Sequence, residues 1–175
     1  MLTARDGAVR IRPVGPGDAD LYLALRGNPG TMRDLGGPLP PDRIRAGHAR
    51  EVAETAAGRA QIVVAEVSTP AGWVPAGNVS LVGSPPAAAE IEWLVLPQHR
   101  GRGVARTAVR LLLGLPGAAE RWGRVEALPS VGNTASNRLC ASLGFTDRGE
   151  VDVDFAGRSF RCRRWELDLR AQVPQ

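Results

Sequence analysis

The segment best suited to chemistry is a glycine-rich turn, Pro97-Gln98-His99-Arg100-Gly101-Arg102-Gly103-Val104-Ala105. Two glycines in so short a turn let successive backbone N–H groups face one point. A helix that starts there adds its unpaired N–H donors and the positive end of its dipole. Arg100, Arg102 and Arg106 add positive charge, with no acidic residue nearby. We therefore expect this turn to hold an anion, and a pyrophosphate fits it.

Two other phosphate-binding turns do not match this segment. A P-loop requires Gly-Lys-Ser/Thr after its glycines, and the chain contains no lysine. A dinucleotide-binding turn requires a third glycine three residues after Gly103, where Arg106 stands. The sequence therefore predicts a phosphate site of a different kind.

The turn lies between a strand and a helix that would hold it in place. Glu90 to Leu96 reads as a strand that Pro97 ends, and Gly103 to Leu113 reads as a helix that Pro116-Gly117 breaks. Further strands are predicted at Val9 to Arg12, Gln61 to Glu66, Trp73 to Val82, Arg124 to Leu128, Thr146 to Val153 and Phe160 to Leu169. Further helices are predicted from an Asp18 cap to Arg26, from Pro41-Asp42 to Gly58, and from an Asn133 cap to Leu143. Loops are predicted at Ser84-Pro85-Pro86 and at the hairpin turn Ala156-Gly157.

Composition bounds the class of protein. With 175 residues, 43% of them hydrophobic and 23% charged, the chain is expected to form one globular domain over residues 1–175, with its core at about 9–169. These values exclude a disordered chain and a coiled coil. All 22 basic residues are arginines, the net charge is +4 and the pI is about 10.3. An anionic partner is therefore expected, but so small a net charge is weak support for nucleic-acid binding.

Cysteine usage and hydropathy point to a soluble, cytoplasmic protein. Cys140 and Cys162 make neither a disulfide framework nor a metal-site spacing. The N-terminus lacks a signal-peptide pattern, and no apolar run approaches the ~20 residues of a membrane span.

An ordered set of motifs resembles one enzyme family. Arg100-x-x-Gly103-x-Ala105, after a strand that ends in Val95-Leu96-Pro97, resembles the acyl-CoA signature of the GNAT N-acetyltransferase superfamily. The segment Asn133-Thr134-Ala135-Ser136-Asn137-Arg138, followed by Leu143-Gly144-Phe145, resembles the last conserved helix of that fold. Five further segments resemble the RimJ/RimL-type branch of this superfamily, which is named for acetylation of ribosomal-protein N-termini. They are Ile11-Arg12-Pro13, Asp18, Asn28-Pro29, Met32 to Gly37 and Ala76 to Leu81.

The resemblance implies a fold and an activity. The fold is a single GNAT-type α/β domain with a mixed central sheet of about seven strands, whose fourth and fifth strands splay around acyl-CoA, and with helices on both faces. The activity is transfer of an acetyl group from acetyl-CoA directly to a primary amine, either a peptide N-terminus or a small amine, without a metal. The protein is expected to be a monomer or a homodimer. A non-catalytic acyl-CoA sensor or scaffold of the same fold, and an RNA-associated protein, are the alternatives.

The resemblance also implies which residues hold acyl-CoA. The backbone of the strand pairs with the pantetheine arm, the amides of the turn hold the pyrophosphate, two arginines contact phosphates, and Asn133 hydrogen-bonds to pantetheine or only caps its helix, with Ser136 beside it. These residues are Leu94, Val95, Leu96, Arg100, Gly101, Arg102, Gly103, Val104, Ala105, Asn133 and Ser136.

The candidate catalytic groups lie on the same strand. The N–H of Val95 would polarise the thioester carbonyl. Glu92 is the first candidate for the base that deprotonates the amine, and Glu90 is the second, because two carboxylates on one strand face raise each other's pKa. A solvated strand face or ion pairs to arginines would equally explain the two acids. His48 and His99 are weaker candidates.

Two features depart from the family pattern or leave it open. Cys140 stands where many members place a tyrosine that protonates the leaving thiolate, and the only tyrosine is Tyr22. Cys140 is therefore expected to be a small core residue. The segment from Ala24 to Arg50 carries several arginines, so a polycationic acceptor is expected less than a peptide N-terminus or an amine that bears a carboxylate.

Overall fold

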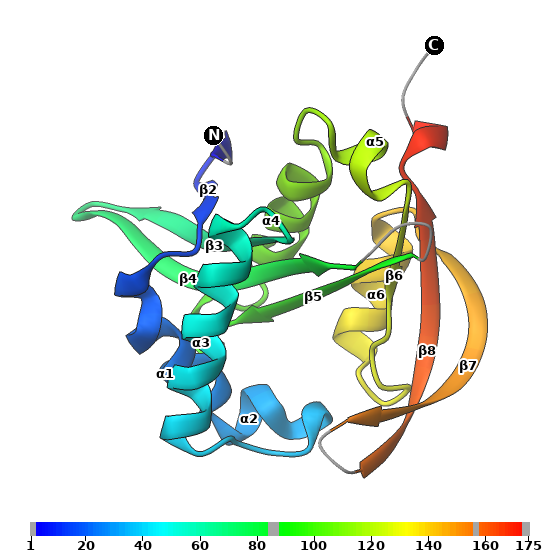
Figure 1. Ribbon diagram of the computed structural model, residues 1–175, viewed down its shortest axis with the longest axis horizontal. Coiled ribbons are helices and arrows are strands. Elements are labelled where there is room, and N and C mark those ends of the chain that lie inside the picture. Colours follow the sequence, from blue (N-terminus) through cyan, green and yellow to red (C-terminus); the bar gives the residue numbers. More distant parts are fainter. Residues whose placement is uncertain (1–2, 84–87, 156–157, 173–175) are drawn as a thin grey trace.

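A computed structural model describes residues 3–83, 88–155 and 158–172. One sheet of eight strands runs through the molecule in the order β1-β2-β3-β4-β5-β6-β8-β7 (Figure 1). The strands are β1 (Ala4–Asp6), β2 (Val9–Pro13), β3 (Ala60–Thr69), β4 (Gly72–Val82), β5 (Ala89–Val95), β6 (Arg124–Ala127), β7 (Thr146–Phe155) and β8 (Arg158–Asp168). The α-helices are α1 (Ala19–Arg26), α2 (Pro29–Met32), α3 (Pro41–Ala56), α4 (Val104–Leu113), α5 (Ala118–Trp122) and α6 (Thr134–Ser142). Short 3-10 helices occupy Pro16–Asp18, Arg33–Leu35, Pro97–His99 and Arg170–Gln172.

The mixed α/β fold and its longer elements follow the predictions from sequence. The elements that were not predicted are β1, α2 and α5, which have 3, 4 and 5 residues. Segments this short do not show a helical or strand periodicity. With β1 the sheet has eight strands, where about seven were predicted. The predicted loop Ser84-Pro85-Pro86 and the turn Ala156-Gly157 lie outside the described residues.

The sheet is open between two neighbouring strands. Every pair of neighbours is antiparallel except β5 and β6, which run parallel and are paired only at Ala89 with Val125 and at Glu90 with Glu126. Beyond Glu90, β5 continues along β4 while β6 diverges from it, and the gap between them is visible in Figure 1. This is the expected splay of two central strands. They were expected as the fourth and fifth strands, and they are β5 and β6 here because the additional strand β1 precedes them.

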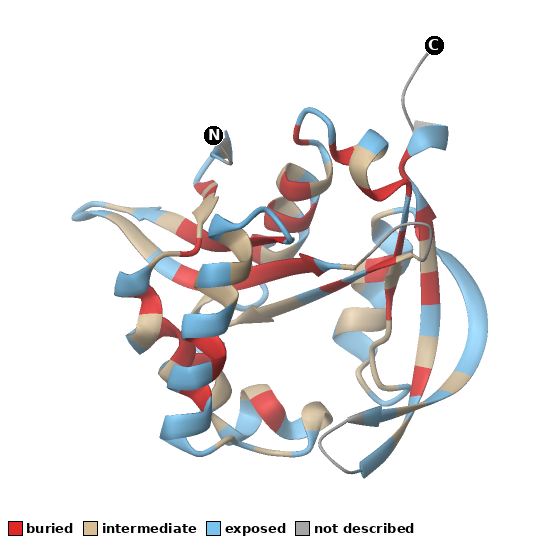
Figure 2. Cartoon of the chain, viewed as in Figure 1, coloured by how far each residue is buried: buried red, intermediate tan, exposed pale blue. Residues whose placement is uncertain are grey.

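Helices cover both faces of the sheet, and Figure 2 shows the buried residues beneath them. On one face α4 packs through Val104, Ala108 and its other apolar residues onto a core that includes Ile91. On the other face α1 and α3 pack through Leu25 and Ile44 onto β3. Since side chains alternate along a strand, Ile91 of β5 lies under α4 and its neighbours Glu90 and Glu92 face the side of α3.

The expected side-chain cap of α1 by Asp18 is wrong. Asp18 stands at the N-cap position, but its carboxylate makes no cap hydrogen bond. It accepts hydrogen bonds from the Arg12 guanidinium at 2.6 and 2.8 Å and from the Gly15 N–H at 2.8 Å. Burial alone would raise the pKa of Asp18, and these hydrogen bonds outweigh it and lower the pKa. The tertiary contact to β2 therefore replaces the local cap.

In the part of the chain that the structure describes, no helix is both long and apolar enough to span a bilayer.

Candidate active site

A cavity of about 100 Å³ occupies the gap between β5 and β6. It brings together five of the predicted site residues, namely Glu90, Glu92, Leu94, Asn133 and Ser136. Its other walls are Ile91, Trp93, the segment from Ala127 to Ser130, and Thr31, Asp34 and Leu35. Residues from three separate segments of the chain therefore meet where the two strands diverge.

The backbone of β5 offers hydrogen-bonding groups to this gap at alternate residues only. The Leu96 N–H donates to the Ala76 carbonyl of β4 at 2.8 Å. Because these groups alternate in direction along a strand, Leu94 also faces β4, whereas Trp93 and Val95 face the gap. Of the predicted pantetheine strand, only Val95 therefore directs its backbone groups to the gap, and its carbonyl accepts a hydrogen bond from Arg100. Sequence reasoning missed Trp93, which the alternation alone would have identified.

Gly77 permits the close approach of β4 to this part of β5. It lies opposite Val95 in the antiparallel ladder. A Cβ atom on Gly77 would collide with the carbonyl oxygen of Leu94. Glycine at this position therefore sets how closely β4 supports the strand that borders the gap.

The glycine-rich turn has the conformation expected of an anion cradle. Gly101 and Gly103 have φ of 71° and 75°, a region that L-residues with a side chain rarely adopt. Gly103 is the N-cap of α4 and gives it no side-chain cap, so the first amides of the helix, including those of Val104 and Ala105, stay available. A Cβ on either glycine would meet nothing within 4 Å, so the space above the turn is open.

The arginines of the turn differ in their contacts. Arg100 donates from Nε to the Val95 carbonyl at 3.0 Å and from a terminal nitrogen to Thr31 Oγ1 at 2.7 Å. Arg102 and Arg106 form no ion pair with any residue in 3–83, 88–155 or 158–172. Arg100 thus ties the turn to β5 and to α2, while the charge of Arg102 has no ion-pair partner in the described part of the chain.

Glu90 and Glu92 lie side by side on β5 without a counter-ion among the described residues. Burial raises the pKa of Glu90 to about 6, with further contributions from the negative charges of Glu92 and Glu126. Burial is also the main reason that the pKa of Glu92 is raised; Arg26 opposes this increase and Glu51 adds to it. Both side chains keep contact with water in the cleft, while the protein around them excludes enough solvent to disfavour the charged forms.

Asn133 caps α6 as predicted. Its Oδ1 accepts a hydrogen bond from the Ser136 N–H at 3.1 Å. Both residues also border the gap. The cap fixes the carbonyl end of the Asn133 amide and leaves its NH2 end for another partner.

The other candidates from the sequence lie apart from the gap. His48 is buried; its Nε2 is 3.0 Å from the Gly15 carbonyl oxygen and its ring packs on Tyr22. Tyr22 is fully buried and donates to Glu51 at 2.6 Å. Cys140 is fully buried in the core beneath α4, where burial raises the pKa of its thiol to about 12. Among the described residues that line the gap, neither His99 nor any of these three appears.

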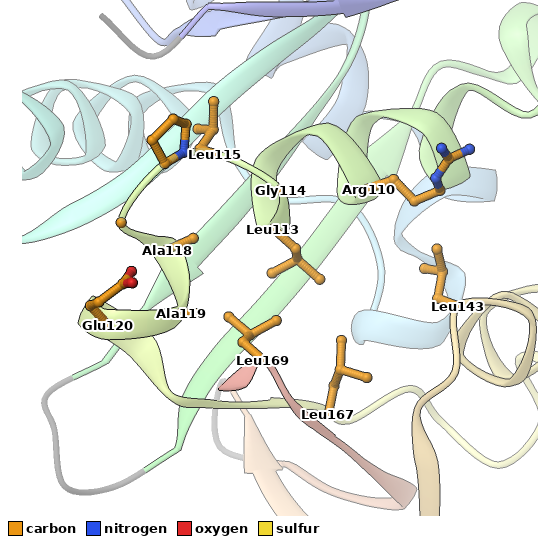
Figure 3. Close-up of a pocket in the computed structure, with 12 residues that line it drawn as sticks. Arg110, Leu113, Gly114, Leu115, Ala118, Ala119, Glu120, Leu143, Leu167 and Leu169 are labelled. Atoms are coloured by element: carbon orange, nitrogen blue, oxygen red, sulfur yellow. The ribbon is translucent and has the colours of Figure 1, made fainter. Parts of the chain in front are cut away.

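A larger cavity, of about 420 Å³, lies between the end of α4, α5 and the end of β8. Leu113, Leu167 and Leu169 point into it, with Arg110 and Glu120 at its edges (Figure 3). None of the predicted site residues lines it. The carboxylates of Glu90 and Glu92 and the gap-facing backbone of β5 therefore converge on the smaller gap and not on the larger cavity.

Comparison with known proteins agrees with this geometry. The sequence model of the Acetyltransferase (GNAT) domain family matches residues 8–146. A search of curated protein sequences finds no match. Among solved structures, ribosomal-protein-S5-alanine acetyltransferase from Vibrio fischeri is 17% identical, with a TM-score of 0.79 over 98% of this chain and 99% of that one.

Two further structures share the fold. The acetyltransferase from Salmonella typhimurium that modifies the N-terminal serine of ribosomal protein L7/L12 is 16% identical, with a TM-score of 0.79 over 93% and 96% of the two chains. Spermidine N-acetyltransferase from Vibrio cholerae, in complex with CoA and spermine, is 19% identical, with a TM-score of 0.77 over 94% and 98%. The family match over most of the chain shows that this protein belongs to the GNAT family of acetyltransferases.

Proposed function

We propose that this protein is an N-acetyltransferase that moves the acetyl group of acetyl-CoA directly to a primary amine, on a peptide N-terminus or a small molecule. The observation that carries this function is the meeting of two kinds of group in one gap. The carboxylates of Glu90 and Glu92 border the gap without counter-ions among the described residues, and the backbone of Val95 faces it. The open anion cradle of Gly101 and Gly103 follows directly after the strand.

The donor would lie along β5. Its pyrophosphate binds the amides of the turn at the start of α4, and Arg102 adds charge at the phosphates. The pantetheine arm runs along the edge of β5 that faces the gap, and the NH2 group of Asn133 donates to it from the other side. The Val95 N–H then points at the thioester carbonyl and stabilises the negative charge that develops on its oxygen.

The acceptor would enter from the side of α3, where the two carboxylates lie. An ammonium group gives one proton to Glu92, and the neutral nitrogen attacks the carbonyl carbon. A C–N bond forms and the C–S bond breaks; the sulfur leaves with the electron pair and takes a proton from the attacking nitrogen through water. The products are an N-acetyl amine and CoA thiol, and the proton on Glu92 returns to solvent. Positioning of the two reactants supplies most of the acceleration.

The structure gives less support to RNA binding. Arginines on β7 and β8 are paired with acids on the neighbouring strand. These ion pairs join Arg148 to Glu166, Arg161 to Glu150 and Asp152, Arg163 to Asp147 and Glu150, and Arg164 to Glu126. Most of the arginine charge on these two strands is therefore neutralised within the chain.

The test is release of CoA thiol from acetyl-CoA with a panel of peptides and small amines. We expect turnover, and we expect Glu92→Gln to lower kcat more than it raises KM, because the amine would lose its base. Glu120→Gln is the matched control, because it is the same substitution at an exposed position of α5. Tight CoA binding without turnover on any acceptor would favour the sensor or scaffold function. If Glu90→Gln lowers kcat and Glu92→Gln does not, the base is Glu90.

A further inference from the structure

A second cavity, of about 230 Å³, adjoins the reactive gap on the side of α3. Glu90 and Glu92 border both cavities, so the two spaces share one wall of β5. The second cavity also has apolar walls, formed by Ala60, Ile62 and Val82 of β3 and β4. A molecule whose reactive amine lies in the gap would therefore have the rest of its length in this space.

The charges around the second cavity are predominantly negative. Two glutamates of α3, Glu51 and Glu54, line it together with Glu90 and Glu92, and Arg50 is the single basic side chain in its walls. Two of the four carboxylates have counter-ions, because Arg26 lies 2.7 Å from Glu51 and Arg59 lies 2.7 Å from Glu54. Glu90 and Glu92 have no ion-pair partner among the residues that the structure describes, and Arg50 is exposed on α3.

An unpaired hydroxyl faces the same space. Ser80 of β4 lines the cavity and is only 7% exposed. It lies directly across the antiparallel ladder from Glu92. Within the described residues its hydroxyl makes no hydrogen bond, so it can pair with a polar group in the cavity. A ligand with N–H donors would satisfy Ser80 and the two carboxylates together.

We propose that this cavity binds a second, protonated nitrogen of the acceptor, so that the preferred substrate is a short aliphatic diamine or a longer amine with a cation at that distance. This inference rests on the proposed acetyl transfer at the adjoining gap. Two residues along a strand have Cα atoms roughly 6.6 Å apart, so the side chains of Glu90 and Glu92 start at about the distance between the two nitrogens of a short diamine. One nitrogen reacts beside Glu92 and its ladder partner Ser80, the methylenes contact Ile62 and Ala60, and the second ammonium binds to the carboxylate oxygens of Glu90.

A cation-binding cavity is the opposite of what residues 24–50 suggested, which was that a polycationic acceptor is disfavoured. The arginines of that segment suggested a site unfavourable to cations, but Arg26 is taken up by Glu51. The acids that line the cavity come from α3 beyond residue 50 and from β5, 36 residues or more further along the chain. An acceptor with a carboxylate near its amine would meet these acids and be repelled.

The experiment compares three acceptors of equal chain length whose far ends differ in charge. Diaminobutane carries an ammonium, butylamine a methyl group and aminobutyrate a carboxylate. We expect kcat/KM to fall in that order, with diaminobutane favoured over butylamine by roughly tenfold, as for one charge-assisted hydrogen bond. The preference should shrink as salt is added.

Two variants locate the preference in the cavity. Glu90→Gln should lower the ratio of kcat/KM for diaminobutane to that for butylamine, and Glu120→Gln should leave the ratio unchanged. Thermal unfolding of each variant checks that the fold is intact. The ratio is independent of any loss that affects both amines equally, so a contribution of Glu90 to the chemistry does not confuse the result.

The outcomes separate this inference from the proposed activity. Acetylation of butylamine with no preference for diaminobutane overturns the inference and leaves the acetyltransferase function standing. If no amine is acetylated, the proposed function fails. Calorimetric titration of diaminobutane into the protein then tests whether the cavity binds a diamine. Binding that Glu90→Gln weakens then supports a diamine site, and absence of binding overturns it.

Discussion

The Nε of Arg100 donates a hydrogen bond to the carbonyl oxygen of Val95 at 3.0 Å, so the first arginine of the glycine-rich turn is tied back to the strand before it. The same guanidinium reaches Thr31 at 2.7 Å. Arg100 was expected from the sequence to contact phosphate, as was Arg102, which has no ion pair among the described residues. The two arginines therefore make different predictions.

Arg102→Ala should weaken binding of CoA by about fivefold and leave binding of dephospho-CoA nearly unchanged, if its charge serves the 3′-phosphate as an exposed ion pair. Arg100→Ala should weaken both ligands to a similar extent, because it removes a brace of the turn. Isothermal titration with the two ligands measures both effects. A loss restricted to CoA in Arg100→Ala would show that this side chain leaves Val95 to bind phosphate.

Gly103→Trp should abolish binding of acetyl-CoA while the protein stays folded. The indole would occupy the open space over the turn, and the left-handed φ should cost about 1–2 kcal/mol of stability. Gly117→Trp is the matched control, because Gly117 is also an N-cap glycine, with φ of 80° and nothing within 4 Å of a Cβ.

Both glycine variants should lose similar thermal stability, and only Gly103→Trp should lose the ligand. Unchanged affinity in Gly103→Trp would remove the pyrophosphate from this turn. Loss of binding in both variants would point to a general effect of the substitution.

Glu90→Gln should stabilise the protein at neutral to alkaline pH and not at acidic pH. Burial raises the pKa of Glu90 from 4.5 to about 6, so the folded state holds the proton more tightly than the unfolded state. The stability that this proton gives is complete below the unfolded pKa and is lost as the pH rises through the folded pKa. Denaturant midpoints at about pH 4 and about pH 8 measure the difference. An equal effect at both values would mean that the pKa of Glu90 is not raised.

Cys140→Ala should retain kcat within about twofold, because a fully buried thiol with its pKa raised to about 12 by burial is a poor proton donor to the leaving sulfur. The substitution should lower the free energy of unfolding by about 1 kcal/mol, since it opens a small cavity in the core. Steady-state kinetics and urea unfolding measure the two effects. A tenfold or greater fall in kcat with the fold intact would make the thiol the general acid.

The sequence by itself determined the local parts of the site. The turn was indicated by Gly101 and Gly103, which lie between a predicted strand and a predicted helix. A left-handed φ and the N-terminus of a helix are local properties that the sequence alone can indicate. Strand alternation placed Glu90 and Glu92 on one face, and the spacing of Asn133 and Ser136 predicted the cap of α6. The ordered motifs then identified the family, and with it the fold.

Only the tertiary structure decided which groups meet and which charges remain. The gap depends on where β6 diverges from β5. The path of the turn brings Arg100 to the Val95 carbonyl, and Asp18 binds Arg12 in place of capping its helix. The same holds around the second cavity, where Arg26 pairs with Glu51 while Glu90 and Glu92 have no ion-pair partner among the described residues. Such pairings join residues that are far apart in the chain, and no local pattern records whether a charge will find a partner after folding.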